Sequence, residues 1–219
     1  QYCTKCVVSN QRPRITFDKN GVCNACNHAK RKSSLIDWNE REKELQDLCD
    51  RFRRDDGSFD VIVPSSGGKD SDVVAHKLKY KYNMNPLTVT WAPHIYTDIG
   101  WKNFQGLIHA GLDNILGTPN GLVHRKLTRL SLLEMGEPFQ PFIYGQTAFP
   151  MQVATKFDIP LIFDGENGEA EYGGDSGTED QPGFSLTDSE DFWLSGVGVN
   201  QWLENGFTPK DLYYYQFPS

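Results

Sequence analysis

Short, mostly apolar runs alternate with helical repeats along this chain. The runs predict strands at 61–63, 87–91, 114–116 and 160–164, and the first of them, 61–63, is expected to be buried on both faces, as in a parallel sheet. Between and after them, apolar residues recur every three or four positions, which predicts helices over 73–82, 99–110, 122–133 and 146–157. Pro150 leaves the start of the last helix open. Alternating strands and helices predict an α/β fold built on a doubly wound parallel sheet.

A further helix is predicted before the first strand, over residues 37–54. Asp37 is suited to cap its start, and Glu40 follows three residues later, as in a capping box. Cys49 lies on the apolar stripe of this helix. We therefore expect Cys49 to be a small core residue and not a nucleophile.

After residue 164, the alternation of predicted strands and helices ends. Residues 165–191 are acidic and rich in glycine, serine and threonine, which favours a solvated loop, with a lid over a bound nucleotide as the alternative. Residues 193–204 could form a short helix. The aromatic end, 207–219, should pack against a surface. That expectation suggests a longer natural chain or a partner that covers this end.

Composition and charge argue against some classes of function. The 219 residues have a net charge of −7 and are 38% hydrophobic, enough for one large or two small domains. The acidic balance argues against a nucleic-acid partner, because phosphate binding favours a basic face. No apolar run is long enough to span a bilayer, and no export signal is visible. A cytoplasmic protein is the expectation.

Four of the five cysteines form two close pairs near the start of the chain. Sixteen residues separate Cys3-x-x-Cys6 from Cys23-x-x-Cys26. Without an export signal, this spacing favours a structural, tetrahedral zinc site over disulfides. Residues 1–36 would then form a zinc-binding module, and 37–219 the α/β domain. Two unrelated pairs, or a redox pair, are the alternatives. His28 could replace one cysteine, but a solvated or capping histidine is the preferred interpretation.

The residues after the first strand predict an anion site. Val61–Asp72 reads as strand, glycine- and serine-rich turn, and helix, and such a turn aims backbone N–H groups at one point. Lys69 adds a positive charge. The Walker pattern does not fit, because Val63 stands where its first glycine belongs and Asp70 where Ser or Thr should follow the lysine. A plain turn between strand and helix is the alternative.

Ser66-Gly-Gly-Lys-Asp-Ser71 resembles the SGGxDS loop of the PP-loop ATP pyrophosphatases, which cleave ATP between the α- and β-phosphates. The resemblance implies that Lys69 neutralises charge on the leaving pyrophosphate and that Asp70 binds Mg²⁺. The ATP-binding positions that it implies are Ser65, Ser66, Gly67, Gly68, Lys69, Ser71, Thr90, Trp91, Gly165, Glu166 and Asn167.

A narrower resemblance covers residues 2 to about 175. Tyr2-Cys-Thr-Lys-Cys-Val-Val8, Asn20-Gly-Val-Cys-Asn-Ala-Cys26, Tyr144-Gly-Gln-Thr147 and Phe163-Asp-Gly-Glu-Asn167 resemble the N-acetyl sugar amidotransferases of bacterial surface-polysaccharide biosynthesis, including lipopolysaccharide O-antigen. The family implies that ATP adenylates the acetamido oxygen of a nucleotide-activated sugar, and that ammonia displaces AMP to give an acetamidino sugar. A separate glutaminase would supply ammonia, through a possible channel-forming partner. Family chains are expected to be longer.

Two other classes stay open. tRNA-modifying PP-loop enzymes, thiolases or lysidine-type ligases, share the ATP chemistry, and thiolases share Cys-x-x-Cys zinc modules. Many thiolases need a further active-site cysteine, and Cys49 is the one thiol left here. A zinc-bearing scaffold without activity is the third class, which the intact phosphate loop disfavours.

Overall fold

The computed structural model describes residues 1–12, 14–166 and 199–218. These residues fall into two compact units. The first holds 1–46 and Glu166, and the second holds 47–165 and 199–218. Among the described helices, none combines the length and the hydropathy needed to cross a membrane. The predicted acidic stretch lies outside the described residues from position 167 onward.

The first unit begins with two hairpin-like turns that bring the cysteine pairs together. Antiparallel bridges join Tyr2 to Ser9 and Phe17 to Cys23, around a small core that includes Ile15 and Val22. Helix α1 (Asn24–Ser34) follows, and the sulfur of Cys23 accepts a hydrogen bond from the backbone N–H of Cys26 at its start. No helix is predicted over 24–34 from the sequence, because α1 has no apolar stripe and buries only His28. His28 is therefore neither solvated nor part of the cysteine group.

Helix α2 (Trp38–Phe52) confirms the helix predicted over 37–54. The Asp37 carboxylate accepts hydrogen bonds from the backbone N–H groups of Asn39 (2.9 Å) and Glu40 (3.3 Å), as expected of a cap. Cys49 is fully buried, which confirms it as a core residue.

The second unit is built on a parallel sheet. Its strands are β1 (Val61–Pro64), β2 (Pro86–Trp91) and β3 (Asp113–Gly117), in the order β1-β2-β3. Both pairings are parallel, and every residue of the central strand β2 is buried. Burial on both faces explains why β1 and β2 read as nearly continuous apolar runs, whereas β3 has exposed residues, including Leu116.

The fourth strand, predicted over 160–164, is reduced to a single parallel bridge between Ile62 and Ile162. Ile62 donates to the carbonyl of Leu161 and accepts from the N–H of Phe163, both at 2.8 Å. Toward the start of β1 the pairing ends, because the backbone N–H of Asp60 donates to the carbonyl of Asn85 (3.2 Å) and not to this segment. This segment lies on the opposite side of β1 from β2, and the order of the sheet therefore reverses at β1.

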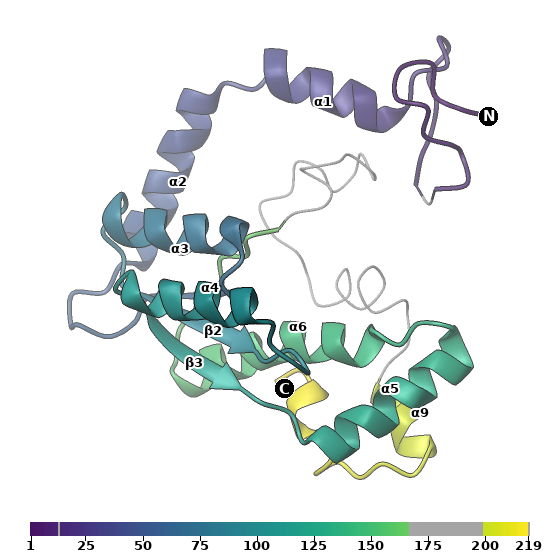
Figure 1. The fold of residues 1–219 in the computed structure, drawn as a ribbon. Helices are drawn as coiled ribbons and strands as arrows, with labels where there is room; N and C mark the ends of the chain where they lie inside the picture. The colour runs from purple at the N-terminus through teal and green to yellow at the C-terminus, as the bar shows by residue number, and fades with distance from the viewer. Residues whose placement is uncertain (13, 167–198, 219) are drawn as a thin grey trace. The chain divides into compact units, whose positions relative to one another are not determined.

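Helices cover both faces of the sheet, as Figure 1 shows. Helices α3 (Lys69–Tyr80) and α4 (Asp98–His109) lie on one face, and α5 (Gly121–Met135) and α6 (Gln140–Lys156) on the other. This arrangement confirms the predicted doubly wound α/β fold. In such sheets, ligands bind beyond the carboxyl ends of the strands, where the strand order reverses.

Helix α6 corrects the helix predicted over 146–157. It begins at Gln140, six residues earlier, and it contains Pro150 in its interior. An interior proline costs about 3 kcal/mol in an isolated helix. Here, ten of the 17 residues are buried and the helix packs on β1 and β2, so tertiary burial offsets that cost.

The aromatic end of the chain packs on α6 of the same chain. Helix α9 (Val199–Glu204) precedes this end, which contains the short 3₁₀ helix η1 (Tyr213–Tyr215). Tyr215 is buried in the main core, and the Gln152 amide donates to the carbonyls of Tyr213 (2.7 Å) and Gln216 (2.6 Å). The surface against which this end was expected to pack is therefore provided by α6 of the same chain. Only 199–204 of the helix predicted over 193–204 lies among the described residues.

Candidate functional site

The turn after β1 has the conformation that its glycines allow. Gly67 has a φ of +86°, in the left-handed region that favours glycine. Its Cα also lies directly against the backbone of α4, because an added Cβ would stand 2.6 Å from the nitrogen of Phe104. The middle of α4, at Asn103 and Phe104, thus holds the glycine-rich turn in place.

Backbone N–H groups at the start of α3 are open to a ligand. Gly68 occupies the capping position and offers no side chain. The first backbone hydrogen bond of the helix runs from Asp72 N–H to Gly68 C=O, at 3.0 Å. The N–H groups of Lys69, Asp70 and Ser71 precede that bond, and in a helix such groups point toward the N-terminal end. With the helix dipole, they can receive an anion.

A hydrogen-bond network under the turn fixes Ser65 and Ser71. The Ser65 hydroxyl donates to the Asp72 carboxylate (2.9 Å) and lies 3.0 Å from the Ser71 hydroxyl. The Ser65 carbonyl accepts from Thr90, whose hydroxyl in turn accepts from the Asn114 amide at 2.9 Å. Burial raises the pKa of Asp72, although the Ser65 hydrogen bond opposes the rise. Asp72 has no role among the residues predicted from the sequence, although its position directly after Ser71 on α3 places it beside the turn.

Three predicted site residues extend from the turn into solvent. Ser66, Lys69 and Asp70 are exposed, with Lys69 and Asp70 side chains 89% and 60% exposed. Lys69 Nζ lies 3.2 Å from a carboxylate oxygen of Asp70. An ion pair this exposed adds little to stability. Both charges can therefore turn toward a ligand at low cost.

The remaining predicted positions divide into three groups. Gly165 joins the turn, because an added Cβ would lie 2.9 Å from the Cα of Ser71. Trp91 points to the other face of the sheet, where its ring is buried against Phe149 and Tyr215. Glu166 belongs to the first compact unit, and Asn167 lies outside the described residues.

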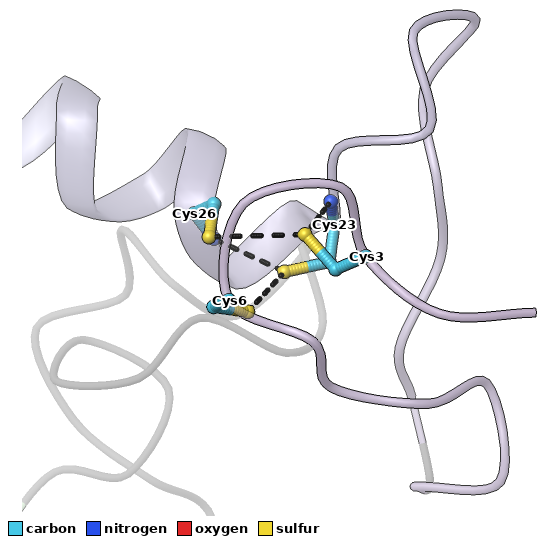
Figure 2. A group of neighbouring side chains, drawn as sticks. All are labelled: Cys3, Cys6, Cys23 and Cys26. Carbon is cyan, nitrogen blue, oxygen red and sulfur yellow. Dashed lines mark hydrogen bonds between the residues drawn. The ribbon is translucent and has the colours of Figure 1, made fainter.

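Figure 2 shows the four cysteines converging within the first unit. Their sulfur atoms all lie within 4.8 Å of one another, with Cys6 and Cys23 3.6 Å apart and Cys3 and Cys26 4.0 Å apart. A tetrahedral Zn–S₄ centre with bonds of about 2.3 Å needs sulfur separations of about 3.8 Å. The separations are too long for disulfides, and all four cysteines are free. The group fits a metal such as zinc.

The backbone around the cysteines favours a thiolate at Cys3. Burial by itself raises the pKa of Cys3, but the backbone N–H groups of Cys6, Cys23 and Lys5 act on its sulfur and lower that pKa to about 6. The neighbouring thiol of Cys6, followed by burial, raises the pKa of Cys26 to about 12. Four thiols this close cannot all ionise without a compensating charge, which a bound cation would supply.

The described residues define an α/β protein with a parallel sheet, a glycine-rich turn that can receive an anion, and a four-cysteine group that can hold a metal. No family model and no curated protein sequence matches the chain.

Among solved structures, the chain is similar to "NH3-dependent NAD synthetase from Campylobacter jejuni subsp. jejuni NCTC 11168 in complex with the nitrate ion". The two are 11% identical, and the match covers 84% of this chain and 99% of that chain with a TM-score of 0.47. A likeness at this level identifies neither activity nor substrate.

Proposed function

We propose that the chain is an ATP-dependent amidotransferase that forms AMP and pyrophosphate. Its acceptor would be a nucleotide-activated N-acetyl sugar, whose acetamido oxygen is adenylated before ammonia displaces AMP. The product would be an acetamidino sugar for a bacterial surface polysaccharide. The observation that carries this proposal is the turn at 65–71, where the motif residues meet uncapped N–H groups at the carboxyl edge of the sheet.

Each motif residue has a separate role in the proposed reaction. Gly67 and Gly68 let a diphosphate approach the backbone closely, and the exposed Lys69 can move to the leaving pyrophosphate. Asp70 lies beside it and could share Mg²⁺ with the phosphate oxygens. Gly165, packed on Ser71, would let the segment after Ile162 border the nucleotide.

The inventory of thiols favours ammonia over sulfur as the nucleophile. Four cysteines form the metal-binding group, and Cys49 is fully buried in α2. Burial also raises the pKa of Cys49, which disfavours its thiolate. Outside the metal-binding group, the chain therefore offers no accessible thiol to carry a persulfide or to hydrolyse glutamine, and a glutaminase partner would supply the ammonia.

The first experiment identifies the products. The purified chain is given ATP, Mg²⁺, ammonium and a UDP-N-acetyl sugar, and the nucleotides are separated. AMP and pyrophosphate are expected, with label from [¹⁵N]ammonium in the product amidine. Lys69→Ala and Ser66→Ala should slow turnover at least about a hundredfold, if each removes one preorganised contact to developing charge. Lys77→Ala is the matched control, because Lys77 is an exposed lysine further along the same helix.

Other product patterns decide against the proposal. ADP as the main nucleotide product would rule out α,β-cleavage. A sulfur-containing product, or activity with tRNA in place of the sugar, would favour the thiolase or lysidine-type alternatives. Transfer of label from amide-labelled glutamine by the isolated chain would remove the need for a glutaminase partner.

A further inference from the structure

A chain of hydrogen bonds links one exposed histidine to two buried side chains. His124 lies in the first turn of α5 and is 1% exposed, whereas His94 is exposed. The Nε2 atoms of the two histidines are 3.1 Å apart. On the other side of its ring, His124 Nδ1 lies 2.6 Å from the hydroxyl of buried Tyr215. Neither the proposed ATP chemistry nor the motif at 65–71 uses these three residues.

The chain fixes the positions of its protons. Burial raises the pKa of Tyr215, so its hydroxyl keeps its proton. Within the described residues, His124 Nδ1 is the one hydrogen-bond partner of that hydroxyl, and Tyr215 must therefore donate to it. Burial, aided by His94, lowers the pKa of His124 to about 4, so its ring is neutral and carries its proton on Nε2. His124 then donates to Nε2 of His94, and a neutral His94 carries its proton on Nδ1.

His94 and His124 lie at the edge of the sheet where ligands are expected. His94 comes three residues after the end of β2, and His124 lies in the first turn of the helix that follows β3. Both positions are beyond strand carboxyl ends, the same edge as the turn after β1. Within the described residues, Nδ1 of His94 has no hydrogen-bond partner, and it is directed away from His124 because the ring's two nitrogens lie on different sides.

We propose that His94 is a ligand-binding residue that donates its Nδ1–H to a phosphate oxygen of a bound nucleotide or nucleotide sugar, and that His124 and Tyr215 are positioning residues that hold it in this tautomer. The geometry that carries the proposal is the continuous Tyr215–His124–His94 chain. Only the choice of ligand rests on the proposed function.

The tautomers can be read directly by NMR. At pH 8, where histidines are neutral in their ordinary range, long-range ¹H–¹⁵N spectra of the full chain with ¹⁵N-labelled histidine should show His94 protonated on Nδ1 and His124 on Nε2. Tyr215→Phe removes the first donor, and His94 should then move to the tautomer mixture of His109. His109 is an internal reference, because it is exposed on α4. A wild-type His94 that already matches His109 overturns the positioning chain.

The ligand is tested by titrating the same sample with MgATP, AMP, UDP-N-acetylglucosamine or inorganic phosphate. At least one of these compounds should change the ¹⁵N chemical shifts of His94 and leave those of His109 unchanged. The compound that does so identifies the source of the phosphate. His94→Ala should weaken binding of that ligand about tenfold, as loss of one good hydrogen bond does. Tyr215→Phe should weaken it about threefold, and His109→Ala should have no effect.

Failure of this inference is distinguishable from failure of the proposed function. If no probe shifts His94, or if His94→Ala binds every probe as tightly as the wild type, the ligand-binding role is wrong even when AMP and pyrophosphate are formed. If the wild type forms no AMP yet His94 shifts with a nucleotide, the role of His94 stands and the amidotransferase proposal fails.

Discussion

Replacement of Gly67 by alanine tests the packing that holds the candidate anion site. Two separate features oppose a side chain at this position. The backbone φ is +86°, and an added Cβ would lie 2.6 Å from the nitrogen and 2.9 Å from the Cα of Phe104. Ordinary contacts of a Cβ lie at 3.4–4 Å, and the atoms that it would meet are backbone atoms of α4, which cannot rotate away.

The expected loss follows from these two features. A left-handed backbone costs an L-residue about 1–2 kcal/mol. Overpacking against a rigid neighbour costs about 1–3 kcal/mol more. Gly67→Ala should therefore lower the free energy of unfolding by about 2–5 kcal/mol, and it should weaken MgATP binding because the turn must shift.

Gly57→Ala is the matched control. Gly57 has a φ of +81°, but an added Cβ would meet nothing within 4 Å. It should lose only the backbone contribution, about 1–2 kcal/mol. Denaturant unfolding of both variants, with equal m-values, isolates the contribution of packing against α4. Equal losses in the two variants would refute the packing argument.

Three further predictions concern other parts of the chain. The protein should bind one zinc ion, and Cys23→Ser should lower both the zinc content by metal analysis and the free energy of unfolding, since binding is coupled to folding; a metal-free chain of unchanged stability contradicts this. Gly145→Ala should destabilise by several kcal/mol, because its Cβ would lie 2.1 Å from the buried Trp91 ring, whereas Gly106→Ala, in an open helical position, should stabilise by up to about 1 kcal/mol. Burial, followed by the nearby His94, lowers the pKa of His124 to about 4, so the unfolded chain takes up that proton first as the pH falls. The free energy of unfolding should then drop by up to about 3 kcal/mol between pH 6.5 and pH 4, and an unchanged slope in His124→Gln would contradict the assignment.

Local patterns predicted what depends on neighbours in sequence. The strand, turn and helix over 61–80 could be read directly, because apolar runs, glycines and helical spacing all act within a few residues. The cysteine pairs were equally readable, since a tetrahedral site constrains the spacing within each pair. The cap at Asp37 and the burial of Cys49 followed from one helical repeat.

Long-range contacts decided what the sequence could not predict. Tyr215 and His124 form a hydrogen bond although they are 91 residues apart in the sequence, and His124 and His94 are 30 residues apart. No local sequence pattern could therefore predict these contacts. The extent of α6 was missed because Pro150 is unfavourable locally and is tolerated through tertiary burial. The segment over 160–164 had a strand's apolar pattern, but the length of a strand depends on its partner, and only Ile162 pairs.

Gly67 and Gly68 are adjacent, yet the structure requires glycine at only one of them. Gly68 has an ordinary φ of −79°, and an added Cβ would meet only the Ser66 hydroxyl, at 3.9 Å. Neither strain nor packing therefore calls for glycine at 68. What glycine does there is leave the N–H groups of α3 open, whereas Thr97 and Asn120 cap the starts of α4 and α5.

Gly68→Ser should accordingly leave the free energy of unfolding unchanged or raise it by a few tenths of a kcal/mol, since serine is a favourable cap. Its hydroxyl would occupy N–H groups that a phosphate needs, so MgATP should bind more weakly when measured by calorimetry. A variant that unfolds more easily would mean that Gly68 has a structural role. A variant that binds MgATP as the wild type does would mean that the start of α3 is not the phosphate site.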